Sequence, residues 1–158
     1  MGDNPKIVWL KRYLNLQRQV DNREETLARY ENAQYLPAMP DSDGSKHTPG
    51  KSDRMANATV RYMEQKAKLL PIIAACKAKM QAIEDAIYAI DDPLEQEVLI
   101  LRYLEGEDGY KHMRWKRVAL AMYNSDDEAD ELRVQRLHGA ALLSLQMEDN
   151  VTNEENDL

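Results

Sequence analysis

The sequence predicts an all-α fold, in which a long antiparallel helical hairpin is followed by three shorter helices. Two extended runs of apolar residues at helical spacing occupy the first 90 residues, separated by a segment rich in Pro, Gly and Ser. Shorter helical runs with capping residues follow them. No alternating pattern typical of β-strands competes with these helices. The 158 residues suffice for one globular domain or for a small domain with an extended helical element.

The first long helix is expected over residues 6–35. Its apolar positions recur every three or four residues, with Arg23 in one expected apolar slot. They are Trp9, Tyr13, Leu16, Val20, Leu27 and Tyr30. Residues 36–53 hold three prolines and two glycines, which predict an irregular loop. Asp53 is then a candidate N-cap for the next helix.

The second long helix is expected over residues 54–90 and carries the strongest periodic signal in the chain. Its heptad positions are Thr59, Tyr62, Lys66, Leu69, Ile73, Cys76, Met80, Ile83, Ile87 and Ile90. Heptads require a partner helix. We expect the first helix to fold back antiparallel and supply it, which makes 1–90 a hairpin domain. A homodimeric coiled coil is the alternative, and the heptads alone do not choose between the two.

Three shorter helices are expected in a second domain, residues 91–147. Asp92 caps the first of them, Pro93 takes its first position and Gly106 closes it. The other two are expected at about 113–123 and 128–147. The predicted buried stripes are Leu94, Val98, Leu101 and Leu104, then Trp115, Val118, Ala119 and Met122, then Leu132, Leu137, Ala141 and Leu145. The acidic segment 148–158 is expected to be a disordered tail.

Composition argues for a cytoplasmic protein without a membrane span. The chain is 43% hydrophobic and 31% charged, with a net charge of −7. It holds no apolar run of about eighteen residues, and its first residues lack the apolar core of a signal peptide. The single cysteine, Cys76, fits a reducing compartment.

Enzyme classes find little support in the sequence, and we expect no catalytic site, metal or cofactor. His47, His112 and His138 have no spacing typical of metal ligands, and no phosphate-binding glycine loop is present. Cys76 occupies an apolar heptad position, so a buried core thiol is a better interpretation than a nucleophile.

The last two helices carry the candidate DNA-binding residues. Lys116 and Arg117 are expected on the outer face of the first of them. Arg133, Gln135, Arg136 and His138 are expected on the polar side of the second. Cationic and amide side chains at the start of a recognition helix can reach phosphates and base edges. The plain alternative is that all six are solvated residues of a small helical bundle, and spacing alone leaves both interpretations open.

A family resemblance favours the DNA-binding interpretation. The segments DDPLEQEVLILRYLEG, RWKRVALAMYNS and RVQRLHGAALLSL resemble the fourth conserved region of sigma-70-type factors. The closer similarity is to ArpU/RinA-like phage and prophage late-gene regulators. The residues that match are Arg102-Tyr103, Trp115, Val118-Ala119, Tyr123 and Ser125, Arg136-Leu137-His138, and Ala141-Leu142. The resemblance covers about residues 1–146, with its specific motif in 98–142.

The resemblance implies a phage or prophage transcriptional regulator with a sigma-region-4-like helix-turn-helix, located in the cytoplasm of a bacterial host cell. Its implied partners are double-stranded DNA and RNA polymerase, with a homo-oligomer built on the hairpin. Two features depart from the family pattern: Asn124 splits the Tyr-Ser pair, and Asp126–Glu131 resembles an acidic insertion. Its five carboxylates would repel phosphates. A small-terminase-like DNA-packaging component and a protein-interaction module without DNA binding are the alternatives.

Overall fold

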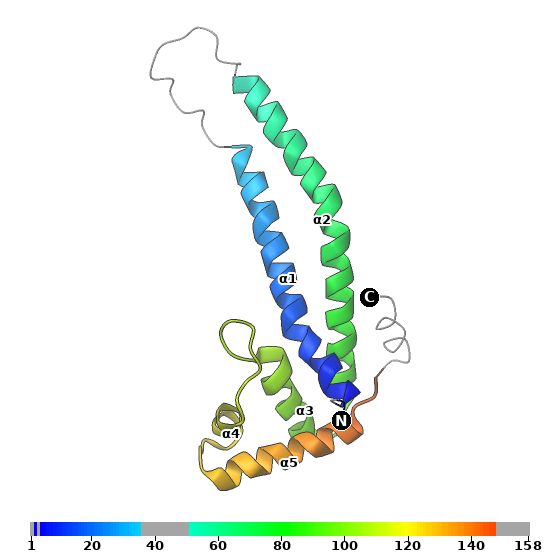
Figure 1. The fold of residues 1–158 in the computed structure, drawn as a ribbon, viewed down its shortest axis with the longest axis vertical. Coiled ribbons are helices and arrows are strands. Elements are labelled where there is room, and N and C mark those ends of the chain that lie inside the picture. The colour runs from blue at the N-terminus through cyan, green and yellow to red at the C-terminus, as the bar shows by residue number, and fades with distance from the viewer. Residues whose placement is uncertain (1, 3, 36–50, 148–158) are drawn as a thin grey trace. The chain divides into compact units, whose positions relative to one another are not determined.

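The computed structural model describes residues 2, 4–35 and 51–147, and these residues form an all-α protein (Figure 1). The elements are α1 (Pro5–Ala33), α2 (Lys51–Tyr88), α3 (Pro93–Leu99), the π-helix η1 (Ile100–Glu105), α4 (Trp115–Tyr123) and α5 (Glu128–Ser144). The predicted fold class is therefore confirmed. The expected tail 148–158 and most of the expected loop 36–53 lie outside the described residues. None of the described helices is long and apolar enough to cross a membrane.

The chain divides into two compact units. The terminal unit combines Met1–Arg18 with Lys77–Leu158, and the central unit is Gln19–Cys76. The terminal unit thus includes residues 1–18 and 77–90, which the sequence assigned to the hairpin domain, together with all the shorter helices.

In the central unit, α1 and α2 contact each other in opposite directions. Near the end of α1, the Thr59 hydroxyl donates a hydrogen bond of 3.2 Å to Gln34 Oε1. Near the middle of α1, the Cys76 thiol donates to Gln19 Oε1 at 3.9 Å. Cys76 is a buried free thiol, in agreement with its heptad position. Residue numbers rise along α1 where they fall along α2, which is the antiparallel order expected from the heptads.

The terminal unit holds most of the buried apolar side chains of the two long helices. Trp9, Tyr13, the α2 positions Met80, Ile83 and Ile87, and Ile90 just beyond the end of α2 are buried, as their periodicity predicted. Leu10 and Leu14 are also buried, although they lie outside the predicted stripe of the first helix. The Tyr13 hydroxyl donates to Glu84 Oε1 across the same helix pair. Burial and this carboxylate raise the pKa of Tyr13.

The third predicted helix is divided into α3 and the π-helix η1. Asp92 caps α3 by accepting hydrogen bonds from the backbone N–H groups of Leu94 and Glu95, with Pro93 at the first position, as predicted. The predicted buried stripe is wrong in part, because Leu94 is 49% exposed and Leu104 is half-buried. Tyr103, which is 1% exposed, is buried instead. Val98 and Leu101 are buried, as predicted. A π-helix has more residues per turn than an α-helix, so α-helical spacing carried on into η1 fails at Leu104.

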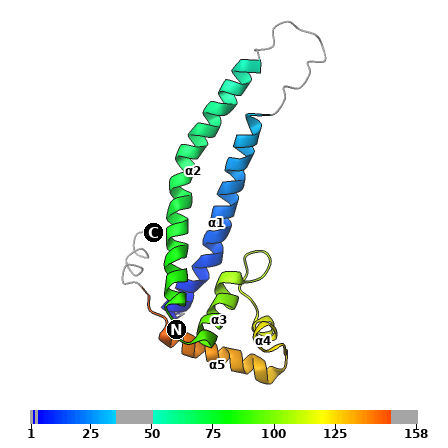
Figure 2. The same ribbon diagram turned by 180° about the vertical axis from the view of Figure 1, so that it is seen from behind.

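Both α3 and α4 pack against α5 (Figures 1 and 2). The inner face of α5 consists of Val134, His138, Ala141 and Leu142, all buried, and the C-cap residue Leu145 is buried too. The expectation of Leu132 and Leu137 in the core is therefore wrong: Leu132 is 47% exposed and Leu137 is half-buried. On α4, Val118 and Ala119 are fully buried. Trp115 and Met122, which were also expected in the core, are only half-buried.

A tight loop joins η1 to α4. Gly106 ends η1 with a φ of +62°, and its N–H donates to the carbonyl of Leu101. Glu107 and Lys111 then form an isolated antiparallel bridge, through backbone hydrogen bonds of 2.7 and 3.3 Å. The loop therefore returns the chain to the end of η1, next to the start of α4.

We predict that Gly106→Ala destabilises the protein by about 1–3 kcal/mol, through left-handed backbone strain and a clash. An added Cβ would collide with the Lys111 carbonyl oxygen and the Leu14 side chain. Gly139→Ala is the matched control, because a Cβ there meets nothing within 4 Å. That change should stabilise α5 by about 0.5–1 kcal/mol. Urea unfolding of both variants tests this, and equal effects of the two substitutions would contradict it.

Candidate nucleic-acid interface

Lys116 and Arg117 lie on the exposed face of α4, as predicted, and line an open groove of about 540 Å³. Two further cations line it, Arg102 from η1 and Arg114 from the preceding loop, and the indole of Trp115 contributes an apolar wall. A groove with four cationic side chains can attract an anionic ligand even on an acidic protein, since local charge governs such contacts.

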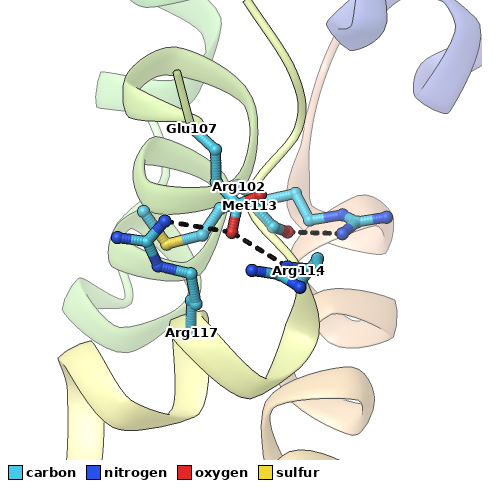
Figure 3. Close-up of polar contacts among 5 residues, drawn as sticks. All are labelled: Arg102, Glu107, Met113, Arg114 and Arg117. Carbon is cyan, nitrogen blue, oxygen red and sulfur yellow. Dashed lines mark hydrogen bonds and ion pairs between the residues drawn. The ribbon is translucent and has the colours of Figure 1, made fainter. Parts of the chain in front are cut away.

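Arg102 links the π-helix to the start of α4 (Figure 3). Its guanidinium lies 4.0 Å from the centre of the Trp115 ring, a cation–π contact. Arg102 Nη1 donates a hydrogen bond of 2.5 Å to the carbonyl of Met113. The backbone N–H of Met113 in turn donates to the carbonyl of Arg102 at 3.1 Å. These contacts hold Arg102 against the chain, so it forms part of the wall of the groove and is not a freely mobile cation.

Glu107 neutralises part of the cationic charge at the groove (Figure 3). Its Oε1 accepts from Arg114 Nε at 3.2 Å and from Arg117 Nη1 at 3.3 Å. Desolvation acts to raise the pKa of Glu107, but Arg114 and then Arg117 outweigh it, so the pKa is lowered. Glu107 therefore stays ionised near neutral pH. A phosphate bound to Arg114 or Arg117 would have to compete with this carboxylate.

Asp126 and Glu131 line the same groove as Lys116 and Arg117. Glu131 belongs to the first turn of α5, where the acidic residues Glu128 and Asp130 also lie. Carboxylates at a helix N-terminus are stabilised by the helix dipole. The acidic run that resembled an insertion is thus largely the start of α5, and it has a structural role there.

The α5 residues Arg133, Gln135 and Arg136 are exposed, as predicted, but they do not line the groove. The Arg133 guanidinium lies 4.4 Å from the centre of the Tyr123 ring at the end of α4. Successive helix residues are about 100° apart, so Arg133 and Arg136 share one side of α5, whereas Gln135 lies on its other flank. The structure thus separates the predicted site into the groove residues of α4 and a cationic side of α5.

The prediction that His138 lies on the polar side of α5 is wrong. His138 is only 8% exposed, and its Nε2 shares a hydrogen bond of 2.7 Å with the Tyr103 hydroxyl. Trp115 packs edge-on against the imidazole, with ring centres 4.8 Å apart. Burial, followed by the charge of Arg102, lowers the pKa of His138 to about 4. Residue type suggested a surface histidine, but a buried partner satisfies its nitrogen and lets it pack in the core.

Sequence reasoning missed Arg102 and Glu107 as residues of this region. Arg102 stood out only as part of the Arg102-Tyr103 pair of the resemblance and as the single base in the acidic stretch 91–110. Its contact with Trp115 depends on the loop that brings residue 113 back to residue 102, and no local pattern reveals that. Within the described residues, no group of His, Cys, Asp and Glu side chains is suited to hold a metal ion.

The chain matches no protein-family model, no curated protein and no solved structure. Its function must therefore be inferred from the residues of this region.

We predict that stability falls as the pH decreases from about 6.5 to about 4. In this range His138 takes up a proton in the unfolded chain, where its pKa is ordinary, but not in the folded protein, where its pKa is about 4. The stabilisation lost is on the order of 3 kcal/mol, and the loss is complete below the folded pKa. Urea unfolding across this range should show a steeper pH dependence for the wild type than for His138→Gln. Parallel pH curves would contradict the prediction.

Proposed function

We propose that this chain is a DNA-binding transcriptional regulator of phage or prophage origin, with a sigma-region-4-like helix-turn-helix formed by α4 and α5. The observation that carries the proposal is the exposure of Lys116, Arg117, Arg133 and Arg136 on two helices joined by a short turn. Asn124 ends α4 in the left-handed conformation, with φ of +52° and ψ of +37°, which lets the chain turn into α5.

The exposed residues suit two different tasks at DNA. Lys116 and Arg117 are spaced to contact phosphates from the start of α4. Arg133 and Arg136, one helical turn apart, are suited to base edges and phosphates along a groove. Gly139 and Ala140 follow on α5, and neither carries a bulky side chain. A Cβ added at Gly139 would meet no atom within 4 Å. A helix with such residues can approach a groove closely. His138, being buried, has no part in the proposed interface.

A protein-interaction module is the second candidate, and two observations favour it. Asp126 and Glu131 in the groove oppose the approach of phosphates. Leu132 and Leu143 on α5 are 47% and 86% exposed, which is typical of a protein contact. A DNA-packaging role remains the third candidate, distinguished by a ring-like stoichiometry in solution.

The first test measures binding to a labelled mixed-sequence DNA duplex as a function of salt. Lys116→Gln and Arg136→Gln should each weaken binding and reduce the slope of log affinity against log salt by about one, since each phosphate contact releases counterions. Arg54→Gln removes an exposed α2 cation and serves as the matched control. Equal effects of all three substitutions would show that the protein binds DNA through its overall charge and not through α4 and α5. No binding at low salt would favour the interaction module.

The second test concerns the carboxylates that share the groove with Lys116. We predict that Asp126→Asn combined with Glu131→Gln strengthens DNA binding, because two charges that repel phosphate are removed. Substitution is preferable to deletion, because Glu131 lies in the first turn of α5. Glu25→Gln combined with Glu31→Gln, at exposed positions of α1, controls for net charge. An equal gain in the control would contradict a specific role of the groove.

A further inference from the structure

Two arginines at the start of α4 converge on a single oxygen atom, Oε1 of Glu107 (Figure 3). Arg114 Nε donates to it at 3.2 Å and Arg117 Nη1 at 3.3 Å. The Glu107 side chain is only 12% exposed, whereas those of Arg114 and Arg117 are 76% and 56% exposed. The two guanidiniums therefore cover the carboxylate and remain accessible from solvent. We call these two side chains the arginine pair.

The backbone at the start of α4 fixes where both side chains begin. Arg114 directly precedes α4, and its carbonyl accepts a hydrogen bond of 2.9 Å from the N–H of Arg117. Residues three apart in this way lie side by side on a helix. The hydrogen bond from Arg102 to the carbonyl of Met113 fixes the residue before them. The spacing of the arginine pair is therefore set by the fold, with or without the carboxylate of Glu107.

Glu107 uses only part of the hydrogen-bonding capacity of the arginine pair. A guanidinium carries several N–H donors in one plane, along more than one edge. Glu107 engages the Nε donor of Arg114 and a donor on Nη1 of Arg117, and its carboxylate also accepts from the backbone N–H of Arg114. The remaining donors belong to exposed side chains. An oxyanion can thus bind the solvent side of the pair while Glu107 stays beneath it.

The charges around the arginine pair favour an anion that carries several phosphates. Two guanidiniums against one carboxylate leave the pair positive, and Lys116 is exposed and lines the same groove. Asp126 and Glu131 also line the groove and reduce its positive charge, so an isolated anion gains little there. A DNA backbone presents a row of phosphates, so that the pair and Lys116 can each contact one.

We propose that the arginine pair binds one phosphate of the DNA backbone on its solvent side, and that Glu107 beneath it keeps the affinity low. This inference rests on the proposed DNA-binding function and adds Arg114 to the residues that carry it. Glu107 has two opposite effects: it holds both guanidiniums at one place, and its charge repels the phosphate. Glutamine separates the two effects, because it keeps an acceptor oxygen without the charge.

The first experiment compares Glu107→Gln with Glu105→Gln in binding to the labelled mixed-sequence duplex. Glu107→Gln should raise the affinity about three- to tenfold at low salt, since it removes a unit charge close to the phosphate. Glu105 is exposed at the end of η1, and Glu105→Gln should raise the affinity by less than about twofold, because that charge is screened. Equal gains, or a loss of affinity with Glu107→Gln, would overturn the role of Glu107.

The second experiment removes each arginine in the Glu107→Gln background, where no carboxylate is left unpaired. Arg114→Gln and Arg117→Gln should each weaken binding about three- to tenfold and reduce the slope of log affinity against log salt by about one. Arg29→Gln is the matched control, because Arg29 is exposed on α1 and also hydrogen-bonded within the chain, to Thr26 Oγ1. Slopes equal to that of the control would overturn the phosphate site.

The outcomes separate this inference from the proposed function. Binding that depends on Lys116 and Arg136, but not on the arginine pair, would support DNA binding by α4 and α5 and overturn the phosphate site. No binding by any variant at low salt would overturn both. Far-UV circular dichroism verifies that each variant is folded, and Arg117→Gln decides the question if Arg114→Gln unfolds.

Discussion

The buried hydrogen bond between Tyr103 and His138 ties the π-helix η1 to α5. Its length is 2.7 Å, and a buried imidazole needs such a partner to avoid the cost of an unsatisfied nitrogen. With His138 fixed inward, the helical period also turns Val134 and Ala141 inward, and both are fully buried. Arg133 and Arg136 then face solvent. The orientation of the candidate interface on α5 thus follows from one buried polar contact.

The same contact organises the start of α4. Trp115 packs its edge on the His138 ring and offers its face to the Arg102 guanidinium, so the indole lies between a buried histidine and a groove cation. Arg102 also donates a hydrogen bond to the carbonyl of Met113. This bond fixes the chain directly before Arg114, the residue that precedes α4. The groove cations therefore take their positions from the core. The net positive charge of the groove is smaller than the number of its cations indicates, because the carboxylates of Glu107, Asp126 and Glu131 lie close to them.

The sequence by itself determined the helices and most of the α2 core. Heptad spacing at Ile73, Met80 and Ile87 is a local property, since only one face of a helix with that pattern can be buried. The Asp92 cap and the Gly106 terminus were likewise predictable, because each depends on neighbouring backbone groups. The tertiary structure alone decided which residues of η1 beyond Leu101 are buried. There a π-turn changed the residues per turn and buried Tyr103, and the tyrosine in turn allowed His138 to be buried, while Leu132 is exposed. Residue type alone placed His138 on the surface and Leu132 in the core, the reverse of what the structure shows. The burial of His138 could not be predicted because its hydrogen-bond partner, Tyr103, lies far away in sequence.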